Sequence, residues 1–386
     1  MSHSAEYIKN LRVDHVGSLL RPQALKDAFR EHRAGALSAG ELRARQDEAI
    51  AQVVREQVDH GLPIVNDGEY RRQVFLQSFS KVAGFEEWEN REIPKRENAK
   101  PADVRPAEHT HDGACCGYSP VPLPLRRATR RLELVNNDIL DEYAFVKGLT
   151  DTPAKVTLIG VDRIIHGYGK PQPQDIYPSL QAFIDDLVRI QRELIAGVAA
   201  AGCRYVSIDE PSLTGYVDPA SIAEQIARGE DPAQNLSHAI AADNAAIAGH
   251  EGVVFGVHLC RGNRQSLWHR EGFYDGIAER LFNELNFDRF LLEYDTPRAG
   301  SFAPLRFVPK GKIVVLGLIT TKVGELETAD GLIRRIEEAS QYIPVEQLAL
   351  SPQCGFASVI EGNLLTPDEQ WRKIDLMLDV ARRVWH

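Results

Sequence analysis

Residues 253–263, VVFGVHLCRGN, place a histidine and a cysteine at the end of a short apolar run that is typical of a buried strand. His258 and Cys260 are two residues apart on an extended chain, so their side chains point to the same side. Glu293 follows a similar run in FLLEYDTP, and Cys354 follows another in LALSPQCGFAS. Thiolate, imidazole and carboxylate ligands together suit zinc. The sequence therefore predicts a zinc site assembled from the ends of three strands.

Working outward from this stretch, apolar β-branched runs alternate with amphipathic helical patterns, such as residues 38–61, 179–202 and 367–384. This alternation predicts an α/β fold with a parallel sheet. Eight candidate strands favour a closed (β/α)8 TIM barrel, formed as a single domain by residues 1–386, over an open doubly wound sheet. The candidate strands are 13–18, 62–69, 155–160, 204–211, 253–260, 290–295, 312–321 and 348–355.

Nearly every candidate strand ends in reactive or ligand-type side chains. In a barrel of this class the carboxyl ends of the strands converge on one face, where active sites are built. The groups predicted to converge there are His15 and Ser18, Asp67 and Glu69, Asp209 and Glu210, His258 and Cys260, Glu293 and Asp295, Lys322, and Cys354.

One segment interrupts this rhythm, from about residue 87 to residue 127, between the second and third strands. It is rich in Pro, Gly and charge, and it is too long for a routine βα loop. We interpret it as an irregular insert that forms a lid or an excursion over the barrel mouth. Its HTHDGACC stretch (His109, His111, Cys115 and Cys116) is either a second metal site or an incidental set of ligand-type residues.

Length, composition and charge exclude several classes of protein. The 386 residues carry a formal net charge of −10, which argues against nucleic acid as a partner. No apolar run is long enough to span a bilayer, and the N-terminus lacks the apolar core of a secretory signal. Five cysteines without a short-spaced framework indicate a reducing compartment. We expect a soluble cytoplasmic protein; the oligomeric state, homo-oligomer included, stays open.

A zinc ion with two thiolates and an imidazole is electron-rich, so it is poorly suited to making hydroxide from water. It is well suited to holding a substrate thiol as thiolate, and the natural reaction is then alkyl transfer to sulfur. Glu293 is either a permanent ligand or one that the substrate sulfur displaces. Glu69, Asp209 and Glu210 are carboxylates for recognising a cation or moving a proton, or else solvated surface groups.

Five further residues are candidates for the site. Ser18, with neighbouring backbone amides in HVGSLLRP, could cradle a carboxylate. Arg21, Arg261 and Arg298 either pair with anionic groups of a substrate or form structural ion pairs. His15 either faces the site or packs beneath it.

These motifs resemble the catalytic domain of cobalamin-independent methionine synthase, in the right order and over nearly the whole chain. HVGSLLRP resembles the family's IGS segment, VNDGEYRR its HGE segment, and SIDEPSL its IDEP motif. VHLCRGN resembles its H-x-C zinc segment, and SPQCGFAS its DCG segment. The resemblance implies a (β/α)8 barrel and homocysteine methylation. It implies zinc ligation by His258, Cys260 and Cys354 with Glu293 as the fourth ligand, and homocysteine contacts at Ser18, Glu69 and Asp209.

The chain also departs from that pattern, in the half of the site that would hold folate. Residues 161–169, VDRIIHGYG, replace a segment that leads to a folate-stacking tryptophan, and Thr214 and Gly215 replace Arg and Glu. Lys322 aligns with the catalytic histidine. The pattern is more similar to short single-barrel members, which include methionine synthase-like proteins and epoxyalkane:coenzyme M transferases.

We therefore expect a zinc-dependent S-methyltransferase that uses homocysteine and a methylated folate or another methyl carrier, with Lys322 or His166 as the general acid. The alternative is the same zinc–thiol chemistry opening an epoxide with coenzyme M. Retention of Glu69 and Asp209 favours an amino-acid thiol. A zinc store that hands over metal through HTHDGACC would need no ring of carboxylates, so it is disfavoured.

Overall fold

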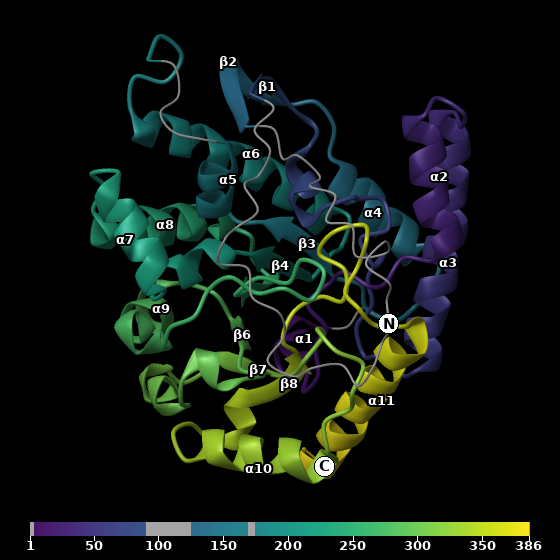
Figure 1. Cartoon of the computed structure of the whole chain (residues 1–386), viewed down its shortest axis with the longest axis vertical. Coiled ribbons are helices and arrows are strands. Elements are labelled where there is room, and N and C mark those ends of the chain that lie inside the picture. Colours follow the sequence, from purple (N-terminus) through teal and green to yellow (C-terminus); the bar gives the residue numbers. More distant parts are fainter. Residues whose placement is uncertain (1–3, 90–124, 169–173, 386) are drawn as a thin grey trace, which may run out of the picture.

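A computed structural model describes residues 4–89, 125–168 and 174–385 of the chain. At its centre lies a parallel sheet of six strands whose spatial order follows the sequence (Figure 1). Sequential parallel neighbours joined by helical crossovers are the arrangement of a TIM-type barrel. The strands are β3 (Val156–Ile159), β4 (Tyr205–Asp209), β5 (Val254–Leu259), β6 (Arg289–Glu293), β7 (Ile313–Ile319) and β8 (Leu348–Pro352).

The first two of the eight predicted strands are reduced to single bridges. Val13 pairs in parallel with Leu350 of β8, and Val65 pairs in parallel with Ala154 just before β3. The contacts between these two segments include a hydrogen bond from Asn66 Nδ2 to the Gly17 carbonyl (2.9 Å) and a main-chain hydrogen bond from the Leu19 amide to the Gly68 carbonyl (3.1 Å). The α/β class and the TIM-type order are thus as predicted, but the ladder does not close within the described residues.

Helices surround the strands, as Figure 1 shows. Helix α3 begins with a capping box at Ser38 and α11 with one at Thr366, which satisfies their first backbone amides. The three helical segments predicted above correspond to α3, α6 and α11. The helices are α1 (Ala5–Lys9), α2 (Gln23–Arg33), α3 (Ala39–Asp59), α4 (Asp138–Lys147), α5 (Val161–Tyr168), α6 (Leu180–Ala200), α7 (Pro219–Ala227), α8 (Pro232–Ile247), α9 (Ala278–Glu284), α10 (Ala329–Ser340) and α11 (Pro367–Val384).

An ion network stabilises the amino-terminal end of the barrel. Asp14 is fully buried and binds Lys155 Nζ (2.6 Å), Arg289 Nη2 (3.3 Å) and the Tyr205 hydroxyl (2.6 Å). Burial alone would raise the pKa of Asp14, but the charges of Lys155 and Arg289 bring it down to about 2. The charges at this end of the strands are therefore paired with one another. The polar groups of the site lie at the opposite, carboxyl end.

The predicted irregular insert is partly regular where it is described. Its edges continue two antiparallel strands, β1 (Val82–Glu89) and β2 (Leu125–Leu134), which pair with each other beside α5 and α6 (Figure 1). The segment from 90 to 124, including HTHDGACC, lies outside the described residues.

Candidate metal centre and active-site cavity

Three of the four predicted metal ligands meet at the carboxyl end of the sheet. His258 is the fifth residue of β5, Cys260 follows that strand, and Cys354 follows β8. One ligand atom from each lies within 4.8 Å of the others, and all three residues are buried. The two Sγ atoms are 3.5 Å apart. With zinc–sulfur bonds of about 2.3 Å, a tetrahedral ion would hold two thiolates roughly 3.8 Å apart. The spacing of the two thiols therefore fits such an ion.

The orientation of His258 supports the same interpretation. Its Nδ1 lies 3.2 Å from the Leu291 carbonyl, which can only accept a hydrogen bond, so Nδ1 carries the proton. The other ring nitrogen, Nε2, is buried and is left for an interaction at the thiol group. A carbonyl that fixes the tautomer of a histidine is a common support for a metal ligand. The donor set thus fits a metal ion bound by His258 Nε2, Cys260 Sγ and Cys354 Sγ.

The two thiols are not equivalent. The hydrogen bond between them holds the pKa of Cys260 well below its usual range and raises the pKa of Cys354. The main-chain N–H of Gly262 also donates to Cys260 Sγ, at 3.2 Å. Backbone donors to sulfur favour the thiolate, which is the form that binds metal.

Glu293, the predicted fourth ligand, is not part of this group of three. Its carboxylate accepts a bond from Arg298 Nη2 at 2.9 Å and another from the main-chain N–H of Arg261 at 2.8 Å. Each of its two carboxylate oxygens thus has one hydrogen-bond partner. In the structure it orders the main chain that directly follows Cys260.

The thiols open into a cavity of about 220 Å³. Ser18, Glu69 and Asp209, the three predicted substrate contacts, also line it. The Ser18 hydroxyl accepts a bond from the Ala357 amide at 3.3 Å, and a side chain at Gly355 would bring a Cβ to 2.1 Å from that hydroxyl. The close approach of Gly355 therefore holds Ser18 beside Cys354.

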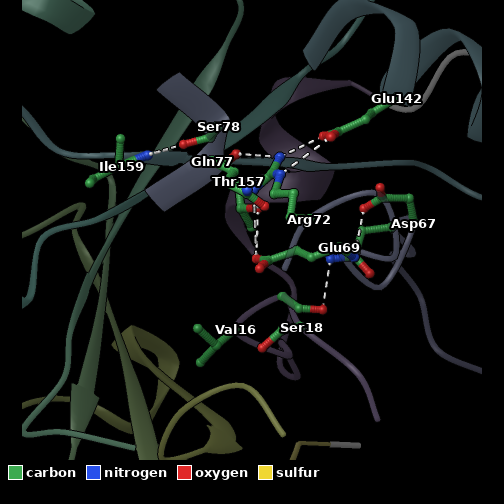
Figure 2. Close-up of polar contacts among 12 residues, drawn as sticks. Val16, Ser18, Asp67, Glu69, Arg72, Gln77, Ser78, Glu142, Thr157 and Ile159 are labelled. Atoms are coloured by element: carbon green, nitrogen blue, oxygen red, sulfur yellow. Dashed lines mark hydrogen bonds and ion pairs between the residues drawn. The ribbon is translucent and has the colours of Figure 1, made fainter. Parts of the chain in front are cut away.

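Glu69 is held in a strained backbone conformation. Its φ is +61°, a left-handed value that non-glycine residues rarely adopt, and it follows Gly68 at +66°. Thr157 Oγ1 donates to Glu69 Oε1 at 2.9 Å, while Arg72 lies 3.9 Å from the same oxygen. In Figure 2, Glu69 lies between these two residues and Ser18. Its second oxygen, Oε2, is buried without a partner among the described residues.

Asp209, the last residue of β4, faces the same cavity. Burial, and then the charge of Glu69, raise the pKa of Asp209 to about 7. Its Oδ1 is buried and, within the part of the chain described, lacks a hydrogen-bond partner. Two adjacent carboxyl groups with unused oxygens form a site for a cationic group such as an ammonium.

Neither predicted general acid lines the cavity. Lys322 is buried, and its ammonium donates to the Gly262 carbonyl and to Asn263 Oδ1, both at 2.8 Å. His166 lies on α5, where its Nδ1 contacts the carbonyl of Asp162 at 2.8 Å. A proton donor must reach the reacting atom directly or through one water, so the structure does not support either role.

His15 and Glu210 also lie outside the cavity lining. His15 is fully buried, and burial together with the charge of Lys155 lowers its pKa to about 3, so it is neutral. Glu210 points away from Asp209, because successive residues of an extended chain face opposite sides. Its carboxylate accepts bonds from the amides of Ser212 and Arg163.

The three predicted anion-binding arginines take structural positions. Arg21 donates to the carbonyls of Glu69 and Arg72 (both 2.8 Å) and of Ala357 (3.0 Å), which joins the loop carrying Glu69 to the one following Cys354. Arg298 bonds Glu293, and the Arg261 guanidinium packs over a tyrosine ring 4.5 Å away. None of the three lines the cavity, so the structural interpretation applies.

Sequence reasoning missed part of the cavity lining. It carries two aromatic and three basic side chains, most of them from the loop after β5. This loop folds back because the amides of residues 269 and 270 both donate to the Arg261 carbonyl. Its aromatic and basic composition was the available signal. The missed residues are Phe75, Trp268, Arg163, Arg264 and Arg270.

The chain matches a known protein family over most of its length. Residues 139–383 match the family described as cobalamin-independent synthase, catalytic domain. The chain is 34% identical to the uncharacterized protein YxjH of Bacillus subtilis over 97% of this chain and 94% of the relative. It is 22% identical to the methionine synthase of Saccharolobus solfataricus, over 93% and 95%.

Solved structures show the same fold. A vitamin-B12-independent methionine synthase-like protein from Listeria monocytogenes superimposes with a TM-score of 0.71 at 27% identity, covering 97% of this chain and 98% of that one. A B12-independent methionine synthase from a Shewanella species, in complex with selenomethionine, gives a TM-score of 0.68 at 19% identity, covering 97% of each chain. No helix among the described residues is long and apolar enough to cross a membrane.

Proposed function

Since the chain belongs to the cobalamin-independent methionine synthase family through its catalytic domain, we propose that it is a zinc-dependent S-methyltransferase that converts homocysteine to methionine. One observation carries the proposal: a buried His–Cys–Cys group opens into the same cavity as two carboxyl groups with unused oxygens. A metal site alone would need only the first of these. An amino-acid thiol needs both, because it presents sulfur and ammonium together.

Each end of homocysteine has a partner in this arrangement. The ammonium fits between Glu69 and Asp209, and the carboxylate fits beside the Ser18 hydroxyl. His258 Nε2, Cys260 Sγ and Cys354 Sγ would hold zinc, and Glu293 would order the main chain after Cys260. When bound, zinc supplies the positive charge that keeps a substrate thiol ionised near neutral pH, where a free thiol of pKa about 8.5 is mostly protonated.

The donor side of the cavity differs from the acceptor side. Phe75 and Trp268 offer flat apolar surfaces, and Arg163 and Arg270 add positive charge. A methyl donor with a flat ring system and an anionic tail, such as a methylated folate, suits this wall. The leaving group needs a proton from a residue of the lining; His269 is there, whereas Lys322 and His166 are not.

The test is methionine formation by mass spectrometry with zinc-loaded protein, homocysteine and 5-methyltetrahydrofolate. We expect turnover that disappears in Cys354→Ser, with the zinc content of both proteins measured in parallel. Homocysteine binding without turnover would leave the thiol assignment intact and direct the search to another methyl carrier. Absence of homocysteine binding by zinc-loaded protein would refute the proposal.

That last outcome would favour the second candidate, a thiol alkyltransferase that opens an epoxide with coenzyme M. The observation in its favour is the basic wall, where Arg163, Arg264 and Arg270 could meet a sulfonate. The carboxyl groups of Glu69 and Asp209 oppose it, since they would repel a sulfonate placed where the amino acid is proposed to bind. Titration with coenzyme M against homocysteine separates the two.

A further inference from the structure

Lys322 contacts the loop that follows the metal ligand Cys260. It is 1% exposed, and its ammonium donates to the Gly262 carbonyl and to Asn263 Oδ1, both at 2.8 Å. Gly262 is the residue whose amide donates to Cys260 Sγ. A buried ammonium is costly unless it is fully hydrogen-bonded, and this one is bonded to the loop that follows Cys260.

Asn263 extends this contact to the other thiol. Its Nδ2 donates to the Gly355 carbonyl at 2.5 Å, and its Oδ1 accepts a bond from Gln353 Nε2 at 3.1 Å. Gln353 and Gly355 are the two neighbours of Cys354 in the chain. One amide side chain is therefore bonded to Lys322 and to both sides of Cys354.

Two further residues, Asn363 and Thr321, add four hydrogen bonds that make the arrangement rigid. Asn363 Nδ2 donates to Asn263 Oδ1 at 3.0 Å and to the Thr321 carbonyl at 2.8 Å. The Thr321 amide donates to Gln353 Oε1 at 2.6 Å, and its hydroxyl donates to the Gly355 carbonyl at 3.1 Å. A buried polar network whose members are satisfied holds one geometry, because breaking any member leaves a polar group without a partner.

We propose that Lys322 is a positioning residue that, through Asn263, locks the loops after β5 and β8 together and so presets the spacing of Cys260 and Cys354 for a metal ion. The proposal rests on the metal site of the proposed function. It replaces the general-acid role that the alignment of Lys322 suggested. The Lys322 ammonium contacts the ligand loops and does not line the cavity, which is consistent with a positioning role.

The test compares zinc affinity in Lys322→Met and wild type, measured on the full chain by competition with a chromophoric chelator. Partners that orient metal ligands typically contribute 10–100-fold in affinity, so we expect the dissociation constant of zinc to rise at least tenfold in K322M. The absorption bands of the cobalt-substituted variant should also change, because they report the geometry of the thiolates. Asn263→Ala should weaken zinc similarly, and the double variant should be little worse than either single one.

Lys312→Met is the matched control. Lys312 lies at the opposite end of β7 and likewise donates to main-chain carbonyls, those of Phe282 (2.8 Å) and Leu285. K312M should lower the thermal stability of the zinc-free protein and leave zinc affinity unchanged. If K322M is too unstable to purify, N263A alone carries the test.

An unchanged zinc affinity and cobalt spectrum in K322M or N263A, with wild type binding zinc, would overturn the positioning role. Additive losses in the double variant would also overturn it, since they would show that the two residues act separately. Failure of wild type to bind zinc would instead refute the proposed function. The two failures are therefore distinguishable.

Discussion

Replacing Thr157 with valine removes the hydroxyl that orients Glu69 and keeps the shape of the side chain. This hydroxyl donates to Glu69 Oε1 at 2.9 Å and accepts a bond from Arg72 Nη1 at 3.0 Å (Figure 2). Thr157 and Arg72 are buried away from the cavity lining, so replacing the hydroxyl leaves Arg72 Nη1 without this partner. A hydrogen bond to a charged group contributes about 1.5–3 kcal/mol. Because Arg72 keeps its ion pair with Glu142, we expect T157V to lower the free energy of unfolding by about 2–3 kcal/mol.

The same change should weaken the binding of homocysteine. A loss of about 1.4 kcal/mol in orienting Glu69 corresponds to a tenfold higher dissociation constant. Urea unfolding measures the first effect and titration calorimetry of zinc-loaded protein the second. Thr157→Ser is the control, because it keeps the hydroxyl and loses only a methyl group. The reasoning is refuted if T157S weakens homocysteine binding as much as T157V does, since the methyl group would then carry the effect.

Two further substitutions test the packing at Gly355 and the protonation of the buried carboxyl group of Asp243. Gly355→Ala puts a Cβ 2.1 Å from Ser18 Oγ, at an overpacking cost of about 1–3 kcal/mol, and should raise the KM for homocysteine. The control is Gly40→Ala, in open space on α3, which should leave the KM unchanged. Equal KM values for the two variants would contradict the crowding argument. Burial and then the charge of Asp162 raise the pKa of Asp243 to about 8, so this carboxyl contributes stability that is lost as pH rises from about 4 to 8. When the pH of urea unfolding is raised from 5.5 to 8.5, the free energy of unfolding of Asp243→Asn should fall by at least about 1 kcal/mol less than that of wild type. Equal decreases in the two proteins would contradict the assignment.

The strands and the thiol group could be predicted because their signals are local. Apolar runs of five to seven residues mark β4 to β8, and the spacing of His258 and Cys260 places both side chains on one side of an extended chain. The same alternation separates Asp209 from Glu210, and its consistent use would have removed Glu210 from the candidate site. The first two strands could not be predicted as single bridges, because their pairing depends on contacts such as Asn66 to Gly17 that join distant segments.

The position of the Lys322 side chain could not be predicted, for a different reason. A residue that follows a strand lies near the barrel mouth, but its sequence position does not say whether the side chain enters the cavity or turns to a neighbouring loop. That choice depends on partners far away in sequence, here Gly262 and Asn263. Trp268 and Arg270 were missed because they lie far along the chain from the end of β5. The loop that carries them folds back to the cavity.

The thiol group and the pair of carboxyl groups in the candidate site differ in the kind of ligand that they would bind. Around the thiols, Lys322 and Asn263 hydrogen-bond the two ligand loops, and His258 Nε2 is left for a metal ion. Around Glu69 and Asp209, one oxygen of each carboxyl group has no hydrogen-bond partner among the described residues, and the pKa of Asp209 stands at about 7 because burial, and then Glu69, oppose its ionisation. An ammonium placed between these carboxyl groups would favour ionised Asp209, whereas a sulfonate would oppose it further. Charge at this end of the cavity, more than its shape, therefore favours an amino-acid thiol over a sulfonate thiol.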